Sequence, residues 1–263
     1  MLKLIRCEFW KLRRKKFVLL VVLSAFLFPI PLTLMMTTPQ ILARYDSKAE
    51  VFDGLFSFTM GYGAELLLPC VIGVVAAMLF FMERDHETFK SLRTIPVTST
   101  QMVLAKIIVL FLFSILFCLV STVVLTVCGG IVLGGVNGLG YKLLMAVEMG
   151  IFMTAGTLPL VVLVVFFSKT YIFSILLCVF YSVLSLTVEC MFTDMPRFLC
   201  WALPIPLITL WSAGDMAQHG FLLNLKEVAE IIPSTLQTVA ILGVMAVLSI
   251  LLIDWLYKRR DER

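Results

Sequence analysis

A charged stretch between two long apolar runs is the part of this chain best suited to bind a partner protein. Acidic and basic residues alternate from Glu83 to Glu87, and apolar residues then recur every three positions from Phe89 until Pro96. This spacing predicts a short amphipathic helix that ends at a turn. Such a helix can dock a cytoplasmic protein, because its apolar side chains fill a groove while its charges set the orientation. The alternative interpretation is a solvated connector between two spans.

Three carboxylates near the ends of apolar runs are candidates for binding a cation. Glu65 precedes Met82 by about 17 residues, roughly 26 Å of helix, and Glu148 precedes Ser168 by about 20 residues, roughly 30 Å. Both are therefore expected near the outer surface of a membrane. Either they reach interfacial water, or Glu65, Glu148 and Glu189 rim an outward-facing cavity that attracts cationic peptides by counter-charge.

The composition indicates what positions these residues. Apolar residues make up 61% of the 263 residues, charged residues 14%, and the mean hydropathy is +1.05. These values exclude an ordinary soluble domain. We predict an all-α, polytopic membrane protein with six transmembrane helices in a single transmembrane domain over residues 1–263. The predicted spans are about 17–36, 58–82, 107–128, 143–167, 171–187 and 234–257.

The distribution of Lys and Arg predicts the orientation. With a cytoplasmic N-terminus, the inner segments hold 16 basic residues and the outer segments five. Because basic residues concentrate in cytoplasmic loops, both termini and the charged stretch are expected inside. The protein is therefore expected in the cell (plasma) membrane.

Basic residues before the first apolar run are interleaved with apolar ones. Leu2, Ile5, Phe9 and Leu12 are spaced three or four residues apart, which places them on one helix face. We predict an N-terminal amphipathic elbow helix in the inner interface, against anionic lipid headgroups rather than nucleic acid. Either this helix only fixes the orientation of the chain in the membrane, or it also packs beside the charged stretch that begins at Glu83.

Several motifs of enzymes are missing from the sequence. No G-x-x-x-x-G-K-[ST] phosphate loop occurs, so ATP-driven work would need a separate chain that binds ATP and Mg. His86-Glu87 lacks the second histidine of a zinc-protease helix, and His219 is the only other histidine. There is no G-x-S-x-G elbow either. We expect no catalytic residue, metal site or bound cofactor in this chain.

The chain resembles the type-2 ABC transporter permease family in the order of its motifs. Glu83 opens the loop after the second span, Thr88-Phe89 and Pro96-Val97 follow, and Ala105-Lys106 opens the third span. Glu87 stands where that family commonly has Gly, and Thr98-Ser99 replaces its Ser-Arg. The resemblance implies that an ATPase couples to this loop. The candidate ATPase-coupling residues are Glu83, Asp85, Glu87, Thr88, Phe89, Leu92, Pro96 and Val97.

Within that family, the chain is most similar to permeases of the lantibiotic-immunity and bacitracin-resistance group, which it resembles in its compact size. This resemblance implies removal of a membrane-active peptide antibiotic, with a cytoplasmic ABC ATPase and a second permease subunit, identical or related, as partners. The alternative is a membrane-embedded enzyme or channel, or a sensory or structural anchor, acting without an ATPase. An enzyme or channel predicts inward polar side chains at mid-membrane. The spans offer mainly Ser114, Ser121, Thr122, Thr126 and Ser174.

A long segment between the last two predicted spans, 188–233, contains an apolar run from Trp201 to Trp211 that is interrupted by Pro204 and Pro206. The run is too short to span a membrane, so it suits a re-entrant hairpin or, alternatively, an aromatic anchor at the interface. Cys190 and Cys200 share this segment, and we expect free thiols rather than a disulfide.

Overall fold

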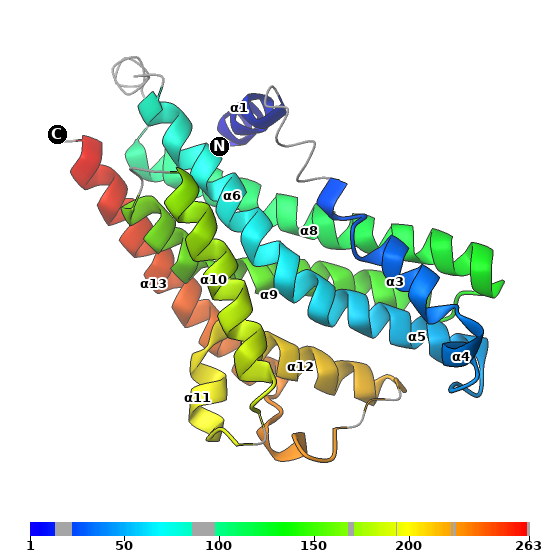
Figure 1. The fold of residues 1–263 in the computed structure, drawn as a ribbon. Coiled ribbons are helices and arrows are strands. Elements are labelled where there is room, and N and C mark those ends of the chain that lie inside the picture. The colour runs from blue at the N-terminus through cyan, green and yellow to red at the C-terminus, as the bar shows by residue number, and fades with distance from the viewer. Residues whose placement is uncertain are drawn as a thin grey trace.

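A computed structural model describes residues 1–13, 23–85, 98–167, 171–192, 194–221, 223 and 225–261. Throughout this described part the regular secondary structure is helical, which confirms the all-α prediction (Figure 1). The elements are α1 Leu2–Arg13, α3 Pro29–Met36, α4 Pro39–Leu42, α5 Lys48–Phe58, the π-helical turn η1 Thr59–Gly63, α6 Ala64–Asp85, α8 Ser99–Leu133, α9 Leu139–Phe166, α10 Tyr171–Glu189, α11 Arg197–Ala202, α12 Pro204–Gln218, the 3₁₀ turn η2 Ala229–Ile231 and α13 Thr235–Asp261.

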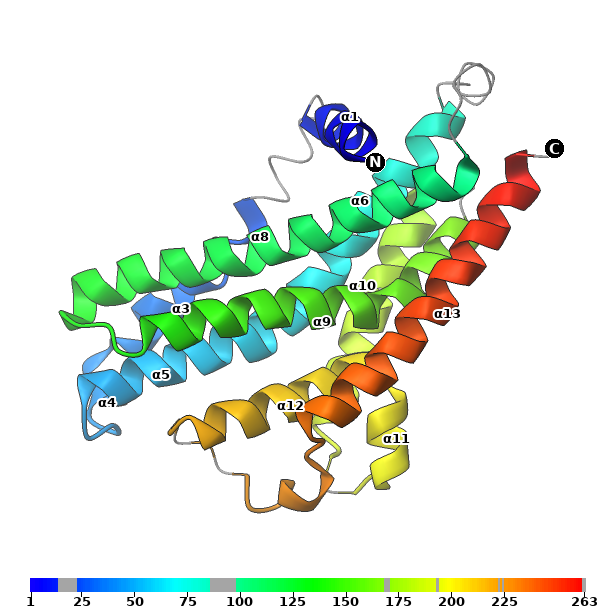
Figure 2. The ribbon, with the colours of Figure 1, turned by 180° about the vertical axis from the view of Figure 1, so that it is seen from behind.

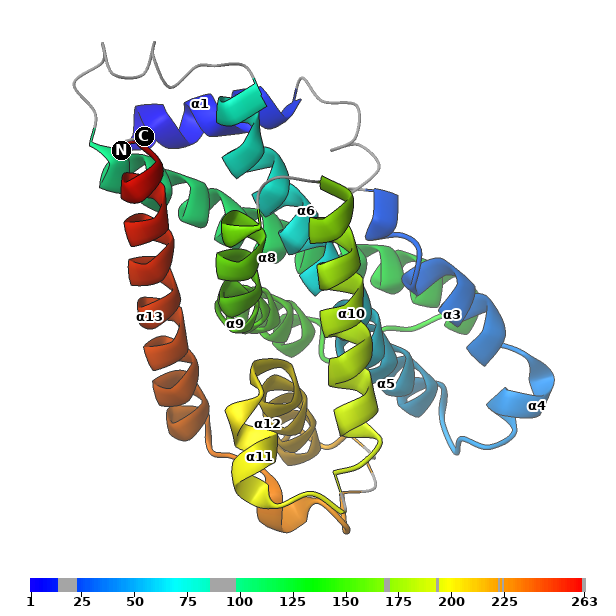
Figure 3. The ribbon, with the colours of Figure 1, turned by 60° about the vertical axis from the view of Figure 1, so that its left-hand side comes forward.

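Long helices pack side by side into one bundle. α9 is central, because α8, α13 and α6 all lie against it (Figure 2). α10 packs along α6, and α1 and α3 lie against α8. The short helices α11 and α12 lie at the end of the bundle opposite to the chain termini (Figure 3).

The number of membrane spans differs in part from the prediction. Five described segments are long and apolar enough to cross a membrane: 48–81, 99–133, 139–166, 172–189 and 235–259. They correspond to the last five predicted spans. The first predicted span, about 17–36, includes residues 17–22, which lie outside the described part. Its described portion contains a turn and the eight-residue helix α3. A sixth span is therefore not confirmed.

The ends of the two central helices follow local sequence signals. α8 begins at a capping box in which Thr98 and Gln101 exchange side-chain and backbone hydrogen bonds. It ends at Gly134, and α9 begins after Gly138, with φ values of 76° and 62° at these two glycines. Because side chains rarely adopt positive φ, glycine permits the tight connection between the two helices.

A glycine also allows α8 and α9 to pack closely. A Cβ atom at Gly150 would lie 2.7 Å from the Cα atom of Ile115, so a side chain there would collide with backbone. Beside it, the hydroxyl of Ser114 donates a 2.8 Å hydrogen bond to the carbonyl oxygen of Gly150. Small and hydroxyl residues are typical of such close helix pairs in membranes.

Candidate functional site

A cavity in the described part of the chain is large enough for an organic ligand. Its volume is about 490 Å³, within the range of roughly 300–1,000 Å³ typical of ligand pockets. α5, η1, the start of α6, the end of α10 and α12 form its walls. Four acidic residues line it, and no Lys or Arg is among its described lining residues. The acidic residues are Glu50, Asp53, Glu65 and Glu189.

Two of the predicted rim carboxylates meet in this cavity. The hydroxyl of Thr209 on α12 lies within hydrogen-bonding reach of Glu65 Oε1 on α6 and at 3.0 Å from Glu189 Oε1 on α10. Glu65 is only 1% exposed, and its other oxygen, Oε2, is buried without a hydrogen-bond partner. Glu65 thus faces the protein interior rather than interfacial water. A carboxylate of this kind is a strong acceptor without a donor.

Aromatic residues form part of the same cavity. The ring of Tyr62 stacks on that of Phe58 at 5.7 Å between centroids, and both line the space beside Glu65. The π-helical turn that contains Tyr62 interrupts the otherwise continuous helix from Lys48 to Phe81. Such turns are frequent at functional sites, because the extra residue turns side chains to new directions. Carboxylates beside aromatic faces favour cations.

A buried ion pair adjoins the cavity. Lys142 on α9, with 2% exposure of its side chain, donates a 2.6 Å hydrogen bond to Asp53 on α5. Its ammonium group also lies 4.7 Å from the centre of the Phe52 ring and 5.3 Å from that of Phe221. Asp53 is therefore neutralised within the protein, whereas Glu65 and Glu189 face the cavity without a cation among the described residues.

The third predicted rim residue lies elsewhere. Glu148, on α9, is not part of the cavity lining. It lies near Asp215 and His219, at the end of α12, where Tyr141 donates a 2.7 Å hydrogen bond to Asp215 and stacks on His219. The structure therefore brings Glu65 and Glu189 together and separates Glu148 from them.

The apolar run expected to form a re-entrant hairpin or an aromatic anchor at the interface lies in two helices, α11 and α12. α11 ends at Ala202 and α12 begins at Pro204, where a proline is tolerated in the first turn. Trp211 is 2% exposed and donates a hydrogen bond to Thr235, while Trp201 donates one to the carbonyl oxygen of Ile231. Both indoles are thus held by neighbouring protein groups. Pro206 lies buried in α12. The same helix places Thr209 beside the carboxylates of Glu65 and Glu189.

The predicted ATPase-coupling segment falls largely outside the described residues. Residues 86–97 are not described, and of 83–85 only the helical backbone is. The described neighbourhood joins three helices. Lys106, fully buried on α8, donates a 2.6 Å hydrogen bond to the carbonyl oxygen of Leu79 on α6 and lies 3.5 Å from Glu8 on α1. Lys11 also pairs with Glu8.

The N-terminal helix is observed where the basic and apolar pattern predicts one. Ile5, Phe9 and Leu12 pack against the core, whereas Leu2 is 85% exposed. Glu8 is also buried on the side of the helix that faces the core, where its carboxylate pairs with Lys106. This helix packs against α8 and α6, next to the point where the coupling segment begins.

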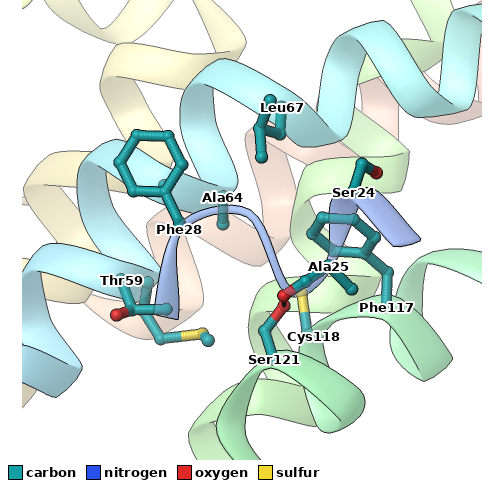
Figure 4. Close-up of a pocket in the computed structure, with 11 residues that line it drawn as sticks. Ser24, Ala25, Phe28, Thr59, Ala64, Leu67, Phe117, Cys118 and Ser121 are labelled. Atoms are coloured by element: carbon teal, nitrogen blue, oxygen red, sulfur yellow. Dashed lines mark hydrogen bonds between the residues drawn. The ribbon is translucent and has the colours of Figure 1, made fainter. Parts of the chain in front are cut away.

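Four of the five mid-span hydroxyl groups are engaged with backbone carbonyl oxygens. Ser114 bonds to Gly150, Ser121 to Ala25, and Thr122 and Thr126 bond within α8. Figure 4 shows the contact between Ser121 and Ala25 at a second, small pocket of about 10 Å³. That volume is about the room of one water molecule.

Metal and disulfide chemistry is not evident in the described residues. No group of three or more His, Cys, Asp or Glu side chains there could hold a metal ion. All seven cysteines are free thiols in the structure, with Cys190 exposed and Cys200 buried. Burial raises the pKa of the Cys200 thiol, which lies outside the candidate spans.

Sequence reasoning missed several residues of the site. Thr209 and Tyr62 carry no local signal, because an isolated hydroxyl and an aromatic residue in an apolar segment are ordinary. Lys142 does carry one, because a single cation beside an apolar run needs a partner. Asp53 is that partner.

Comparison with known proteins identifies the family. A family model described as ABC-2 family transporter protein matches residues 4–185, which is more than half of the chain. A comparison with curated proteins found no match. The match includes α1 from residue 4 onward, the charged stretch, Glu65 and Glu148, whereas Glu189 lies beyond it. The chain belongs to the ABC-2 family of transporter proteins, and it is a multi-pass membrane component of an ABC transporter.

Proposed function

We propose that this chain is the permease subunit of an ABC exporter that removes a membrane-active peptide antibiotic, of the lantibiotic or bacitracin kind, for self-immunity or resistance. A cytoplasmic ABC ATPase hydrolyses ATP for it, and a second permease, identical or related, completes the pathway. The single observation that carries this proposal is the ABC-2 family match over residues 4–185.

The distribution of basic residues supports the orientation of the permease in the cell membrane. The charged stretch and both termini are cytoplasmic in this proposal, and the basic N-terminal residues contact anionic lipid. The charged stretch follows α6, and the acidic cavity begins at the other end of the same helix. Glu65 and Asp85 are separated by 20 residues, or about 30 Å of helix, which is about the thickness of the hydrocarbon layer.

The substrate class is supported by the character of the cavity. An acidic, partly aromatic cavity at the outer end of the helices suits cationic molecules that have accumulated in the membrane. In the proposed cycle, ATP hydrolysis on the partner changes the arrangement of the helices, and the peptide leaves on the outer side. α11 and α12 form a re-entrant segment that closes the outer end of the pathway.

Co-purification tests the proposal. Tagged permease is purified from its native cells in mild detergent, and the proteins recovered with it are identified by mass spectrometry. We expect an ATPase with a phosphate loop. The double variant Phe89→Asp and Leu92→Asp should lower its recovery at least about tenfold, because a charge in an apolar docking contact leaves buried polar surface unpaired.

The matched control makes the same chemical change at the opposite end of the molecule. Leu236 is 80% exposed at the start of α13, so Leu236→Asp should leave recovery unchanged. Absence of any ATPase from the parent preparation would exclude the proposed function. Full recovery with the folded double variant would exclude residues 86–97 as the main coupling contact.

A further inference from the structure

The carboxylates of the large cavity lack hydrogen-bond donors. Thr209 has one hydroxyl hydrogen, and three acceptors lie within its reach: Glu65 Oε1, Glu189 Oε1 and the carbonyl oxygen of Ile205. One hydrogen serves one of them at a time. Glu65 Oε2 is buried and has no partner at all. The carboxyl groups of Glu65 and Glu189 also lie within hydrogen-bonding reach of each other, where they can share one proton. Glu65 Oε2 still has no donor among the described residues.

A primary ammonium group has the donors that this cluster lacks. It carries three N–H bonds and a positive charge, so it can donate to Glu65, to Glu189 and to the oxygen of Thr209 together. The stacked rings of Tyr62 and Phe58, on the wall of the same cavity, favour a cation at their faces.

The volume distinguishes an organic cation from a bare metal ion. A cavity of about 490 Å³ is far larger than a metal ion with its ligands, and a hard metal ion needs about six oxygen ligands. No metal-binding group of three or more His, Cys, Asp or Glu residues occurs in the described part. The remaining space accommodates the chain that carries the ammonium group.

We propose that this cavity binds a primary ammonium group, such as a lysine side chain of a cationic peptide, with Glu65, Glu189 and Thr209 as its acceptors. This inference deepens the proposed function by naming the substrate group that is recognised. It rests on that function only for the identity of the transported molecule, because binding to the purified permease needs no ATPase.

The test measures binding of a fluorescent amine to the purified permease in detergent. The probe is dansylcadaverine, whose dansyl fluorophore is joined through a five-carbon chain to one primary amine, and the reference probe is its N-acetylated, neutral form. We expect the amine to bind at least about tenfold more tightly than the acetylated probe. Glu65→Gln and Glu189→Gln should each weaken amine binding about tenfold, as for lost hydrogen bonds to a charged group.

A third variant tests the cavity without changing its charge. Gly61 lines the cavity, and a Cβ atom there would meet nothing within 4 Å, so Gly61→Leu should fill the space and weaken the binding of both probes. Gly243, on α13, is equally open, and Gly243→Leu is its control. Glu227→Gln removes an acidic charge outside the cavity, and this variant should bind the amine as the parent does.

Three results would overturn the inference. The first is equal affinity of the parent for the amine and the acetylated probe. The second is unchanged amine binding by both glutamine variants. The third is unchanged binding by Gly61→Leu. If Glu65→Gln does not remain monodisperse, Glu189→Gln and Gly61→Leu decide the outcome. Loss of ATPase recovery with amine binding intact would reject the proposed function and retain the binding site.

Discussion

Lys106 on α8 donates a 2.6 Å hydrogen bond to the carbonyl oxygen of Leu79 on α6. The two helices are joined by the charged stretch that we propose as the ATPase contact. The same ammonium group lies 3.5 Å from Glu8 on α1 and 5.4 Å from the centre of the Phe80 ring. One buried cation on α8 therefore contacts both α6 and α1.

The pair of Lys106 and Glu8 should be strongly coupled. Breaking a buried ion pair by removing one partner costs about 3–5 kcal/mol. Glu8→Ala should therefore lower the thermal midpoint of the purified permease by several degrees. In a Lys106→Met background the same change should cost much less, and a double-mutant cycle measures the difference.

Lys11 provides the control for this cycle. It also pairs with Glu8, but 30% of its side chain is exposed, so Lys11→Met should cost less than about 1 kcal/mol. Additive effects of Glu8→Ala and Lys106→Met on the free energy of unfolding would show that the two residues act independently. That result would contradict the coupling between Lys106 and Glu8.

The contact of α8 with α9 should depend on the absence of a side chain at one position. Gly150→Ala places a Cβ atom 2.7 Å from the backbone of Ile115, and overpacking of this kind costs about 1–3 kcal/mol. Gly243→Ala, where nothing lies within 4 Å, should be neutral or slightly stabilising, because alanine favours helix. Thermal unfolding in detergent compares the two. A midpoint for Gly150→Ala at or above that of Gly243→Ala would contradict the close packing.

Hydropathy predicted the last five spans because a long apolar run is a local property of the sequence. The start of the second span was placed at about residue 58, whereas the helix begins at Lys48. Glu50 and Asp53 interrupt the apolar pattern there. Asp53 is accommodated by Lys142, which is 89 residues away in the sequence, and a local pattern contains no information about that partner.

The candidate site was predictable only in part for the same reason. Counting residues along each helix placed Glu65 and Glu148 at similar depths in the membrane. It did not reveal which helix faces contact each other. Glu65 meets Glu189 through Thr209, which lies 144 residues further along the chain than Glu65. Glu148 faces Asp215 and His219 instead. The grouping of these acids is a result of packing between distant segments.

The predicted orientation can be tested by labelling. In a cysteine-free background, cysteines introduced at Ser47 and Gln218 should react with an impermeant thiol reagent on intact cells, because both positions are exposed at the proposed outer side. A cysteine at Ser91 should react only after the cells are opened. Labelling of Ser91 on intact cells, with neither of the other positions labelled, would invert the orientation.

The acidic positions should affect protection against a cationic peptide antibiotic more than assembly. Glu65→Gln and Glu148→Gln each keep the shape of the side chain and remove its charge, so protection should fall while expression and ATPase recovery stay unchanged. Growth inhibition at increasing peptide concentrations measures the effect.

The effects of Glu65→Gln and Glu148→Gln on protection should differ in their dependence on ionic strength. Glu148 is partly exposed, so its attraction of a peptide should weaken at high ionic strength, whereas Glu65 is buried and its effect should persist. Protection by the double variant equal to that of the parent would reject a role for either carboxylate. Lost expression would assign them to structure.

Retention of a labelled peptide by cells tests the central claim most directly. Cells express the permease together with the ATPase that co-purifies with it. They are exposed to a fluorescent lantibiotic, and the membrane-bound fluorescence is measured. The comparison is with cells in which the phosphate-loop lysine of that ATPase is replaced. We predict several-fold less retained peptide only with the active ATPase. Equal retention by both kinds of cells would contradict ATP-driven export through this permease.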